Sequence, residues 1–181
     1  MGGSPTRVGP RAHARVYVKN VGGGGGGMIA PMRAVCQRVS RARVSVGGAA
    51  TGEIGAGLVV LLGVERGDTQ VQADRLADKI ARLRVFEGDD GRFARSVLDT
   101  GGPALVISQF TLLADARKGT RPDFSRAAPP DVAEPLYERF AEALGRLGVP
   151  VERGVFGARM DVELVNSGPV TIVLDVDPGA V

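Results

Sequence analysis

The sequence predicts an α+β fold in which a curled antiparallel or mixed sheet closes towards a β-barrel and two helices pack outside it. Short apolar or alternating segments separated by glycine turns recur along the chain, which indicates roughly eight strands. Two longer segments carry apolar residues at helical spacing. With 181 residues, 44% of them apolar, the chain suits one domain with a substantial core, and we expect no membrane span.

Strands are expected throughout the domain. Segments 33–39 and 42–46 alternate polar and apolar residues, and 51–55 leads into the nearly continuous apolar segment 58–64. An apolar segment of this length indicates a central strand that is buried on both faces. Short glycine-containing connections favour hairpins, and therefore an antiparallel or mixed sheet. Later strands are expected at 84–87, 104–107, 151–156, 160–165 and 170–174.

Two amphipathic segments are the predicted helices. The first covers 70–83 with Asp68 as its N-cap, and the second follows Asp131 and ends at Gly148 and Pro150. We expect both to bury their apolar stripes against the sheet. The stripe residues are Ala73, Leu76, Ala77, Ile80 and Leu83 in the first helix, and Val132, Leu136, Phe140, Ala143, Leu144 and Leu147 in the second.

The first 31 residues differ in composition from the rest of the chain. They hold four basic residues, no acidic residue and a run of six glycines. Such a segment cannot bury enough apolar surface to order itself, and it lacks the apolar stretch of a secretory signal. We therefore expect residues 1–31 to be a disordered extension, 32–177 to form the domain and 178–181 to be a C-terminal tail.

The charge of the domain is close to balanced. The whole chain has 23 basic and 20 acidic residues and a pI of about 9.5. Without the extension, 19 basic and 20 acidic residues remain, so the high pI does not describe the domain. Basic residues still gather in 33–43 and in 117–126, where they either form solvated faces or contact a few phosphates.

The buried segment 104–107 ends in a run of polar and aromatic residues, Ser108, Gln109, Phe110 and Thr111. Polar groups at the end of a buried strand must find hydrogen-bond partners or face a ligand. Hydrogen bonds to neighbouring backbone would account for them without any function. The alternative is a binding or catalytic site formed by these four residues.

The segment Asn166-Ser167-Gly168-Pro169 interrupts the last two predicted strands. A Gly-Pro pair between two β segments is ordinarily a plain turn or bulge. Under a functional interpretation, the Gly168–Pro169 bond is cis and presents a rigid backbone edge that senses shape, with Asn166 holding it in place.

Several kinds of chemistry are excluded by what the sequence lacks. Its single histidine, His13, lies in the extension, and its single cysteine is Cys36. The domain therefore cannot form a Ser-His-Asp or Cys-His catalytic group, an internal disulfide or a zinc site. No glycine-rich segment has the spacing of a phosphate-binding loop. An enzyme with this composition must use hydroxyls, backbone groups or a group that the substrate supplies.

The segments 108–112 and 166–171 together resemble the paired signature of the D-aminoacyl-tRNA deacylases. The resemblance extends over residues 32 to about 175, nearly the whole domain, and the extension has no counterpart in it. Four further stretches resemble that family in the same order, namely 37–42, 52–55, 61–64 and 121–125.

The resemblance implies an enzyme that hydrolyses the ester between a D-amino acid, or glycine, and the 3′-terminal adenosine of tRNA, and that spares L-aminoacyl-tRNA. It implies a cytoplasmic homodimer with a barrel-like fold, active sites at the subunit interface, no required cofactor and no membrane contact. The cis Gly168–Pro169 pair of one subunit would enter the pocket of the other and leave no room for an L side chain.

The resemblance also implies roles for individual residues. Thr111 matches a threonine once proposed as the nucleophile and later regarded as a positioning residue, with the ribose 2′-hydroxyl assisting attack by water. The later view agrees with the absence of a base near Thr111 in its motif. Backbone N–H groups around Phe110 and Thr111 would stabilise the oxyanion, while Phe110 and Gln109 would line the adenosine pocket, beside Ser108. Arg38 matches the family arginine near the Gly-Pro pair.

The chain departs from the family pattern at two places. It has Phe93-Ala94 where the family commonly has Met-Asn, and Ser167 where an aspartate commonly precedes Gly-Pro. The main alternative to a deacylase is a non-catalytic nucleic-acid-binding dimer on the same fold, since a relative in animals has a DNA-associated role and usually carries a basic tail. This chain has a basic segment at its other end.

Overall fold

A mixed sheet that curls into a nearly closed barrel forms most of the fold, as predicted. The computed structural model describes residues 15–21, 32–117 and 119–176. Its strands are β1 (Arg15–Val21), β2 (Met32–Val46), β3 (Ala49–Ile54), β4 (Gly57–Gly63), β5 (Phe86–Glu87), β6 (Phe93–Arg95), β7 (Ala104–Ser108), β8 (Val151–Arg153) and β9 (Asp161–Val176). Its helices are α1 (Gln70–Ala81), α2 (Val97–Thr100), α3 (Pro130–Arg146) and the 3-10 helix η1 (Phe110–Leu113).

The main sheet has the strand order β1-β9-β2-β4-β7-β8, and β3 pairs with β2 beyond the point where β4 ends. β2 runs antiparallel to β3, β4 and β9, whereas β4, β7 and β8 are parallel to one another. The short strands β5 and β6 form a separate hairpin. The long strands β2 and β9 bend together, because their register shifts twice near the middle, and this bend curls the sheet.

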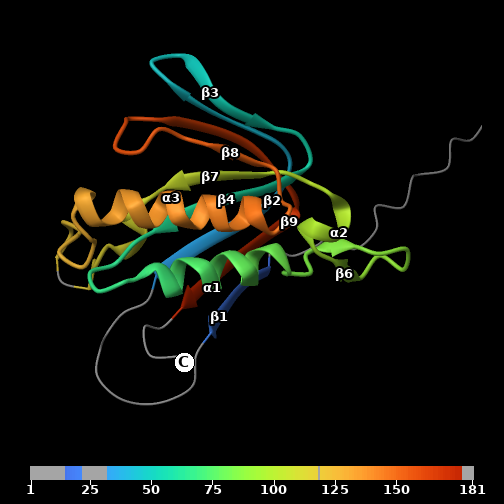
Figure 1. The fold of residues 1–181 in the computed structure, drawn as a ribbon, viewed down its shortest axis with the longest axis horizontal. Coiled ribbons are helices and arrows are strands. Elements are labelled where there is room, and N and C mark those ends of the chain that lie inside the picture. The colour runs from blue at the N-terminus through green and yellow to red at the C-terminus, as the bar shows by residue number, and fades with distance from the viewer. Residues whose placement is uncertain (1–14, 22–31, 118, 177–181) are drawn as a thin grey trace, which may run out of the picture.

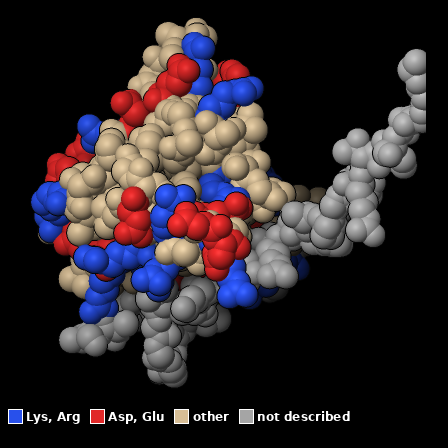
Figure 2. Space-filling view, turned by 90° about the vertical axis from the view of Figure 1, so that its right-hand side faces the viewer, with Lys and Arg blue, Asp and Glu red and all other residues tan. Residues whose placement is uncertain are grey.

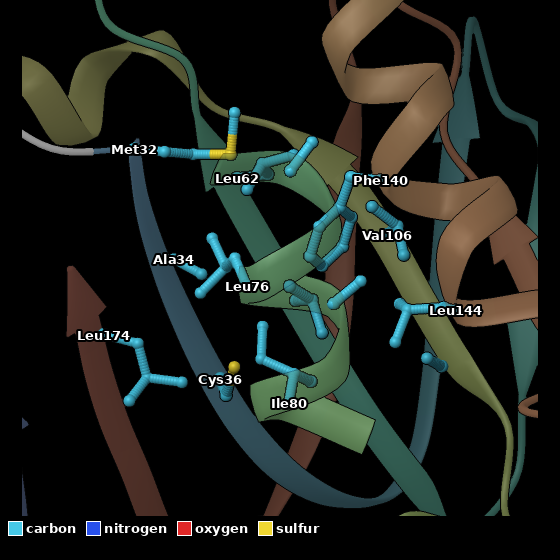
Figure 3. Close-up of a cluster of buried hydrophobic side chains, with 14 of the residues drawn as sticks. Met32, Ala34, Cys36, Leu62, Leu76, Ile80, Val106, Phe140, Leu144 and Leu174 are labelled. Carbon is cyan, nitrogen blue, oxygen red and sulfur yellow. The ribbon is translucent and has the colours of Figure 1, made fainter. Parts of the chain in front are cut away.

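Two hydrophobic cores lie on the two faces of the sheet. α1 and α3 lie side by side across one face (Figure 1) and bury most of the predicted stripe residues there, against the sheet. Val132 is the exception, because it is 39% exposed. A smaller core fills the inside of the curl on the other face. Strands β4 and β7 contribute to both cores, so the prediction of a central strand buried on both faces is confirmed. Figure 3 shows the larger core, with Leu76 and Ile80 of α1 facing Phe140 and Leu144 of α3 above the sheet.

Some predicted boundaries are wrong, because long strands bend rather than break. The separate strands expected at 33–39 and 42–46 are one strand, β2, and those expected at 160–165 and 170–174 are one strand, β9. The short helices α2 and η1 were not predicted, since four residues carry too little periodicity. α3 begins at Pro130 with Pro129 as N-cap, and Asp131 lies in its first turn instead.

The N-cap of α1 is Thr69 rather than the predicted Asp68. The Thr69 hydroxyl accepts from the Val71 N–H, and the Gln72 side chain accepts from the Thr69 N–H at 2.8 Å, which completes a capping box. Asp68 turns the other way, and its Oδ2 accepts from the Glu65 N–H at 2.7 Å.

The structure places one strand inside the segment that was expected to be disordered. The backbone of Arg15–Val21 forms β1, which pairs in parallel with β9 along the edge opposite β2. The sequence Val16-Tyr17-Val18 has the β-branched and aromatic residues that favour a strand. The rest of the expected extension and the expected C-terminal tail lie outside the described residues. Within the described ranges, no helix is long and apolar enough to span a membrane.

The burial of Asp68 generates a prediction about stability and pH. Burial raises the pKa of this carboxyl from its ordinary value of 3.8 to about 6, and among the described residues its Oδ1 atom has no hydrogen-bond partner. Between these two pKa values the folded protein keeps a proton on Asp68 that the unfolded chain releases. The free energy of unfolding therefore falls as the pH rises through that window.

We expect Asp68→Asn to remove this loss, which amounts to about 3 kcal/mol at most for a shift of this size. The measurement is the free energy of unfolding by urea, at several pH values between about 4 and 7, for both proteins. The informative quantity is the difference between the two pH profiles, because the substitution also changes stability at every pH. Parallel profiles would contradict a raised pKa of Asp68 in the folded protein.

Candidate functional site

A cavity of about 510 Å³ opens beside the end of β7. Its walls are mainly apolar and aromatic, as is usual for small-molecule sites. Of the residues predicted to be catalytic, Ser108, Gln109 and Phe110 line it and Thr111 does not. The remaining lining residues are Val64, Ile107, Phe124, Ala127, Ala128, Pro130, Ala133, Phe156, Gly157, Ala158, Met160 and Val162.

The segment that carries the predicted catalytic residues leaves the sheet abruptly. Ser108 is the last residue of β7, the Gln109 N–H still donates to the Leu62 carbonyl at 2.8 Å, and η1 begins at the next residue. A side chain at Gly63 would lie 3.3 Å from the Gln109 carbonyl oxygen, so glycine allows this close approach. The segment is therefore attached to a strand that is buried on both faces.

Thr111 points its hydroxyl at an amide rather than at a base. The Gln109 Nε2 donates to Thr111 Oγ1, and both groups lie at the surface. The backbone N–H groups of Phe110 and Thr111 form the first turn of η1, and neither has a hydrogen-bond partner among the described residues. Phe110 lines the cavity and Thr111 follows it directly, so these two N–H donors lie close to the cavity, where they can bind a developing negative charge.

An aromatic pair stands at the cavity. Phe110 is 56% exposed, and its ring meets that of Phe124 edge to face, with ring centroids 5.2 Å apart. Phe124 lies in the loop between η1 and α3, directly after Asp123. Paired backbone hydrogen bonds between Asp115 and Asp123, at 2.7 and 2.9 Å, close the preceding part of this loop. Phe124 was part of a resembling segment, but no role was predicted for it, because only the fold brings it to Phe110.

An ion pair fastens the same loop to the end of β4. Arg126 donates from Nε and Nη2 to the two carboxylate oxygens of Glu65, at 2.8 and 3.2 Å. Glu65 is 5% exposed, so the pair is poorly screened by solvent. Removing one partner of such a pair leaves a buried charge without compensation, and the pair therefore restrains the loop.

The Gly168–Pro169 pair lies in a large bulge of β9. Across the bulge the ladder passes from Gln37 opposite Thr171 to Val39 opposite Asn166, so four residues of β9 face one residue of β2. Asn166 closes the bulge, because its Oδ1 accepts from the Val170 N–H at 2.9 Å and its Nδ2 donates to Thr171 Oγ1 at 3.0 Å. The Gly-Pro pair itself is exposed.

The residue opposite the bulge is Arg38, whose side chain is buried. Its Nε donates to the Ser167 carbonyl at 3.1 Å, its Nη1 to the Val85 carbonyl at 2.8 Å and its Nη2 to a Glu87 carboxylate oxygen at 3.2 Å. A side chain on Gly168 would lie 2.6 Å from Arg38 Nη2. Arg38 and a glycine at 168 are therefore packed against each other.

The expectation of a cis Gly168–Pro169 bond is wrong for this structure, which contains no cis peptide bond within its described residues. The trans form is intrinsically favoured for bonds that precede proline. Here the chain changes direction at Gly168 itself, which has a φ of +117° that other residues rarely adopt. The rest of β9 stays extended on both sides of it.

The structure separates the two predicted motifs within one chain. Ser108, Gln109 and Phe110 line the cavity, whereas Gly168 and Pro169 do not, and neither do Asn166 and Arg38. The Gly168–Pro169 turn is exposed and does not line the cavity of its own chain. In the described part of the chain, no group of three or more His, Cys, Asp or Glu side chains could hold a metal ion.

Comparison with known proteins places the chain in a family. The family model described as D-Tyr-tRNA(Tyr) deacylase matches residues 35–175. The D-aminoacyl-tRNA deacylase of Roseiflexus castenholzii is 62% identical over 144 residues, which cover 80% of this chain and 92% of that protein. The D-aminoacyl-tRNA deacylase of Ruegeria pomeroyi is 59% identical over 145 residues, which cover 80% of this chain and 100% of that protein.

Two solved structures share the fold of this chain. A structure named "c-Myc DNA Unwinding Element Binding Protein" has a TM-score of 0.75 and 44% identity, covering 80% of this chain and 98% of that chain. A structure of a probable eukaryotic D-amino acid tRNA deacylase shares the fold, with a TM-score of 0.69 and 18% identity over 80% of this chain and 98% of that chain. The chain therefore belongs to the D-aminoacyl-tRNA deacylase family.

Proposed function

We propose that this protein hydrolyses the ester bond of D-aminoacyl-tRNA and of glycyl-tRNA in the cytoplasm, and releases free tRNA and the amino acid. The observation that carries the proposal is the position of the segment 108–111 at an apolar cavity, in a chain whose relatives bear the name D-aminoacyl-tRNA deacylase. The 3′ end of the aminoacyl-tRNA would enter this cavity.

The side chains present favour attack by water over attack by a side chain. Thr111 is hydrogen-bonded to the Gln109 amide, which cannot act as a base, and the single histidine of the sequence is His13. Water would attack the ester carbonyl carbon with help from the ribose 2′-hydroxyl. The bond from that carbon to the ribose 3′ oxygen would break, and the oxygen would take up a proton. The N–H groups of Phe110 and Thr111 would bind the oxyanion.

The aromatic pair supplies a surface for the terminal adenine. Phe110 is more than half exposed although it is apolar, and Phe124 braces its ring from the side. Stacking of a base on an aromatic side chain contributes about 1–3 kcal/mol. The cavity volume of about 510 Å³ lies within the range of sites that enclose small organic ligands.

Selection between D and L substrates would come from the Gly168–Pro169 turn of a second subunit in a homodimer. The turn is exposed and does not line the cavity of its own chain. Hydrogen bonds of Arg38 and Asn166 to the backbone on either side of the turn hold it in place. A rigid main-chain edge entering the partner's cavity would occupy the space that an L side chain needs. Glycine has no side chain to reject, so glycyl-tRNA would be accepted.

The direct test compares hydrolysis of D-tyrosyl-, L-tyrosyl- and glycyl-tRNA under single-turnover conditions. We expect the D form and the glycyl form to react at least about 100-fold faster than the L form, because a steric clash of about 3 kcal/mol corresponds to two factors of ten. A chelator should leave the rates unchanged. Equal rates for the D and L forms would contradict selection by the turn, and no hydrolysis of any form would contradict the proposed activity.

Replacing Thr111 separates a positioning role from a nucleophilic one. Thr111→Ala should lower kcat by about tenfold or less, the effect of one lost hydrogen bond. Loss of a true side-chain nucleophile costs on the order of a millionfold in kcat. Thr51→Ala is the matched control, because Thr51 is also an exposed threonine but lies on β3, outside the segment 108–111. A loss approaching that of a nucleophile in the Thr111 variant alone would make Thr111 the attacking group.

The second candidate function is nucleic-acid binding without catalysis. It is favoured by the 44% identity to the structure named as a DNA unwinding element binding protein. Against it, Figure 2 shows a face on which acidic and basic side chains are interspersed rather than gathered into one basic surface. The four basic residues of the first 31 positions would then have to supply much of the affinity for phosphates.

A chain that begins at Met32 distinguishes the two functions. We expect it to keep the deacylation rate of the full chain within about twofold, because the residues assigned to the site all lie beyond position 31. Any binding to duplex DNA should become weaker and less dependent on salt. The measurements are deacylation rates and fluorescence anisotropy over a salt series. Binding of duplex DNA that is strong in the full chain and falls in the shortened one, with no deacylation by either, would favour the second function.

A further inference from the structure

The β5–β6 hairpin meets the bulge of β9 through the Arg38 side chain. We propose that this hairpin is a positioning element for the Gly168–Pro169 turn, and that Phe93 at the start of β6 is the residue through which it acts. The inference rests on the proposed function, in which that turn selects between D and L substrates. It adds to that function a specificity-determining residue that lies outside both signature motifs.

Arg38 connects the β5–β6 hairpin to the bulge of β9 through the three nitrogen atoms of its guanidinium group. Nε donates to Ser167 in the bulge, while Nη1 and Nη2 donate to Val85 and Glu87 at the start of the hairpin. The guanidinium is planar, so a rotation that improves one of these bonds degrades the others. The position of the hairpin and the position of the bulge are therefore coupled.

The ring of Phe93 also contacts the guanidinium group of Arg38, which lies over it. The Arg38 Cζ atom lies 5.6 Å from the centroid of the Phe93 ring, which is the geometry of a cation–π contact. The ring is 45% exposed, and Phe93 belongs to neither hydrophobic core. Core packing therefore does not explain a phenylalanine at this position, whereas restraint of the guanidinium does.

The hairpin is tightly built around this contact. A side chain on Gly88 would lie 2.9 Å from the Ala94 Cβ atom, so the two strands approach closely beside Phe93. The Gly88 N–H donates to the Arg92 carbonyl at 2.8 Å, and the Val85 N–H donates to the Arg95 carbonyl at 3.1 Å. These bonds hold the backbone of the hairpin and limit where the ring of Phe93 can lie.

The guanidinium of Arg38 also limits where the turn can lie. The position that a Cβ atom of Gly168 would occupy is 2.6 Å from Arg38 Nη2, so no space separates the guanidinium from the turn. A guanidinium that is free to tilt would let the turn shift. Because rejection of an L side chain depends on that turn, discrimination would fall before deacylation of the D substrate is lost.

The test measures kcat and KM for D-tyrosyl-tRNA and L-tyrosyl-tRNA with Phe93→Ala, Phe93→Leu and Phe93→Tyr. Loss of the ring should lower the D:L ratio of kcat/KM about two- to fivefold, the effect expected of one exposed cation–π contact. Phe93→Leu keeps apolar bulk without the ring face and should behave like Phe93→Ala, while Phe93→Tyr should retain the ratio. Val71→Ala is the control, because Val71 is 52% exposed and lies on α1, outside both the hairpin and the bulge.

A double-mutant cycle with Arg38→Lys tests whether Phe93 acts through Arg38. Lysine keeps the charge but lacks the planar group that bridges hairpin and bulge, so Phe93→Ala should have no further effect on the D:L ratio in that background. An unchanged ratio in the single Phe93 variants, or the same change in both backgrounds, would overturn the inference. Thermal melting of each variant separates a folding defect from loss of discrimination.

Gly168→Ala distinguishes failure of this inference from failure of the proposed function. If the unmodified protein prefers the D substrate and Gly168→Ala lowers that preference while Phe93→Ala does not, the turn selects and the hairpin does not position it. If the unmodified protein shows no preference for the D substrate, the proposed selection fails and this inference fails with it.

Discussion

The burial of one guanidinium group is the interaction on which the arrangement of the Gly168–Pro169 turn depends. Moving a charge out of water is costly unless hydrogen bonds replace those that water made. Arg38 recovers them from two main-chain carbonyls, those of Ser167 and Val85, and from the more exposed carboxylate of Glu87. The main chain of the bulge therefore stays where the guanidinium needs it. In the proposed function the turn needs this kind of support, because its own residues are exposed.

A different constraint holds the cavity side of the site. Strands β4 and β7 are covered by both hydrophobic cores, so they form the most deeply buried part of the sheet. The segment from Ser108 to Thr111 continues directly from β7, and its backbone is still bonded to β4 at Gln109. The hydroxyl, amide and N–H groups beside the cavity thus sit on a rigid element, although the groups themselves are exposed. The packing of both hydrophobic cores against β4 and β7 therefore fixes the position of these groups.

The chemistry available to this fold is limited, so in the proposed function the selection between substrates comes from shape. The cavity segment offers hydroxyls, one amide and free backbone donors, and none of these is a strong base or nucleophile. Such groups can orient water and stabilise charge, and they can do so equally for both enantiomers of a substrate. Discrimination between enantiomers then needs a second surface at a defined distance. In the proposed dimer that surface is the turn of the neighbouring subunit, and the Arg38–hairpin contact would adjust its position.

Local sequence patterns alone determined the sheet-rich fold, both long helices and the doubly buried central strand, because periodicity and turn residues are local properties. The two signature segments were identified by their resemblance to a family. Tertiary structure decided what depends on neighbours in space. It joined pairs of predicted strands into bent β2 and β9, and transferred the α1 cap from Asp68 to Thr69. It also brought Phe124 to Phe110 and Phe93 to Arg38. Local pattern could not predict whether the Gly168–Pro169 peptide bond is cis or trans, because a glycine can make the turn through its φ angle alone.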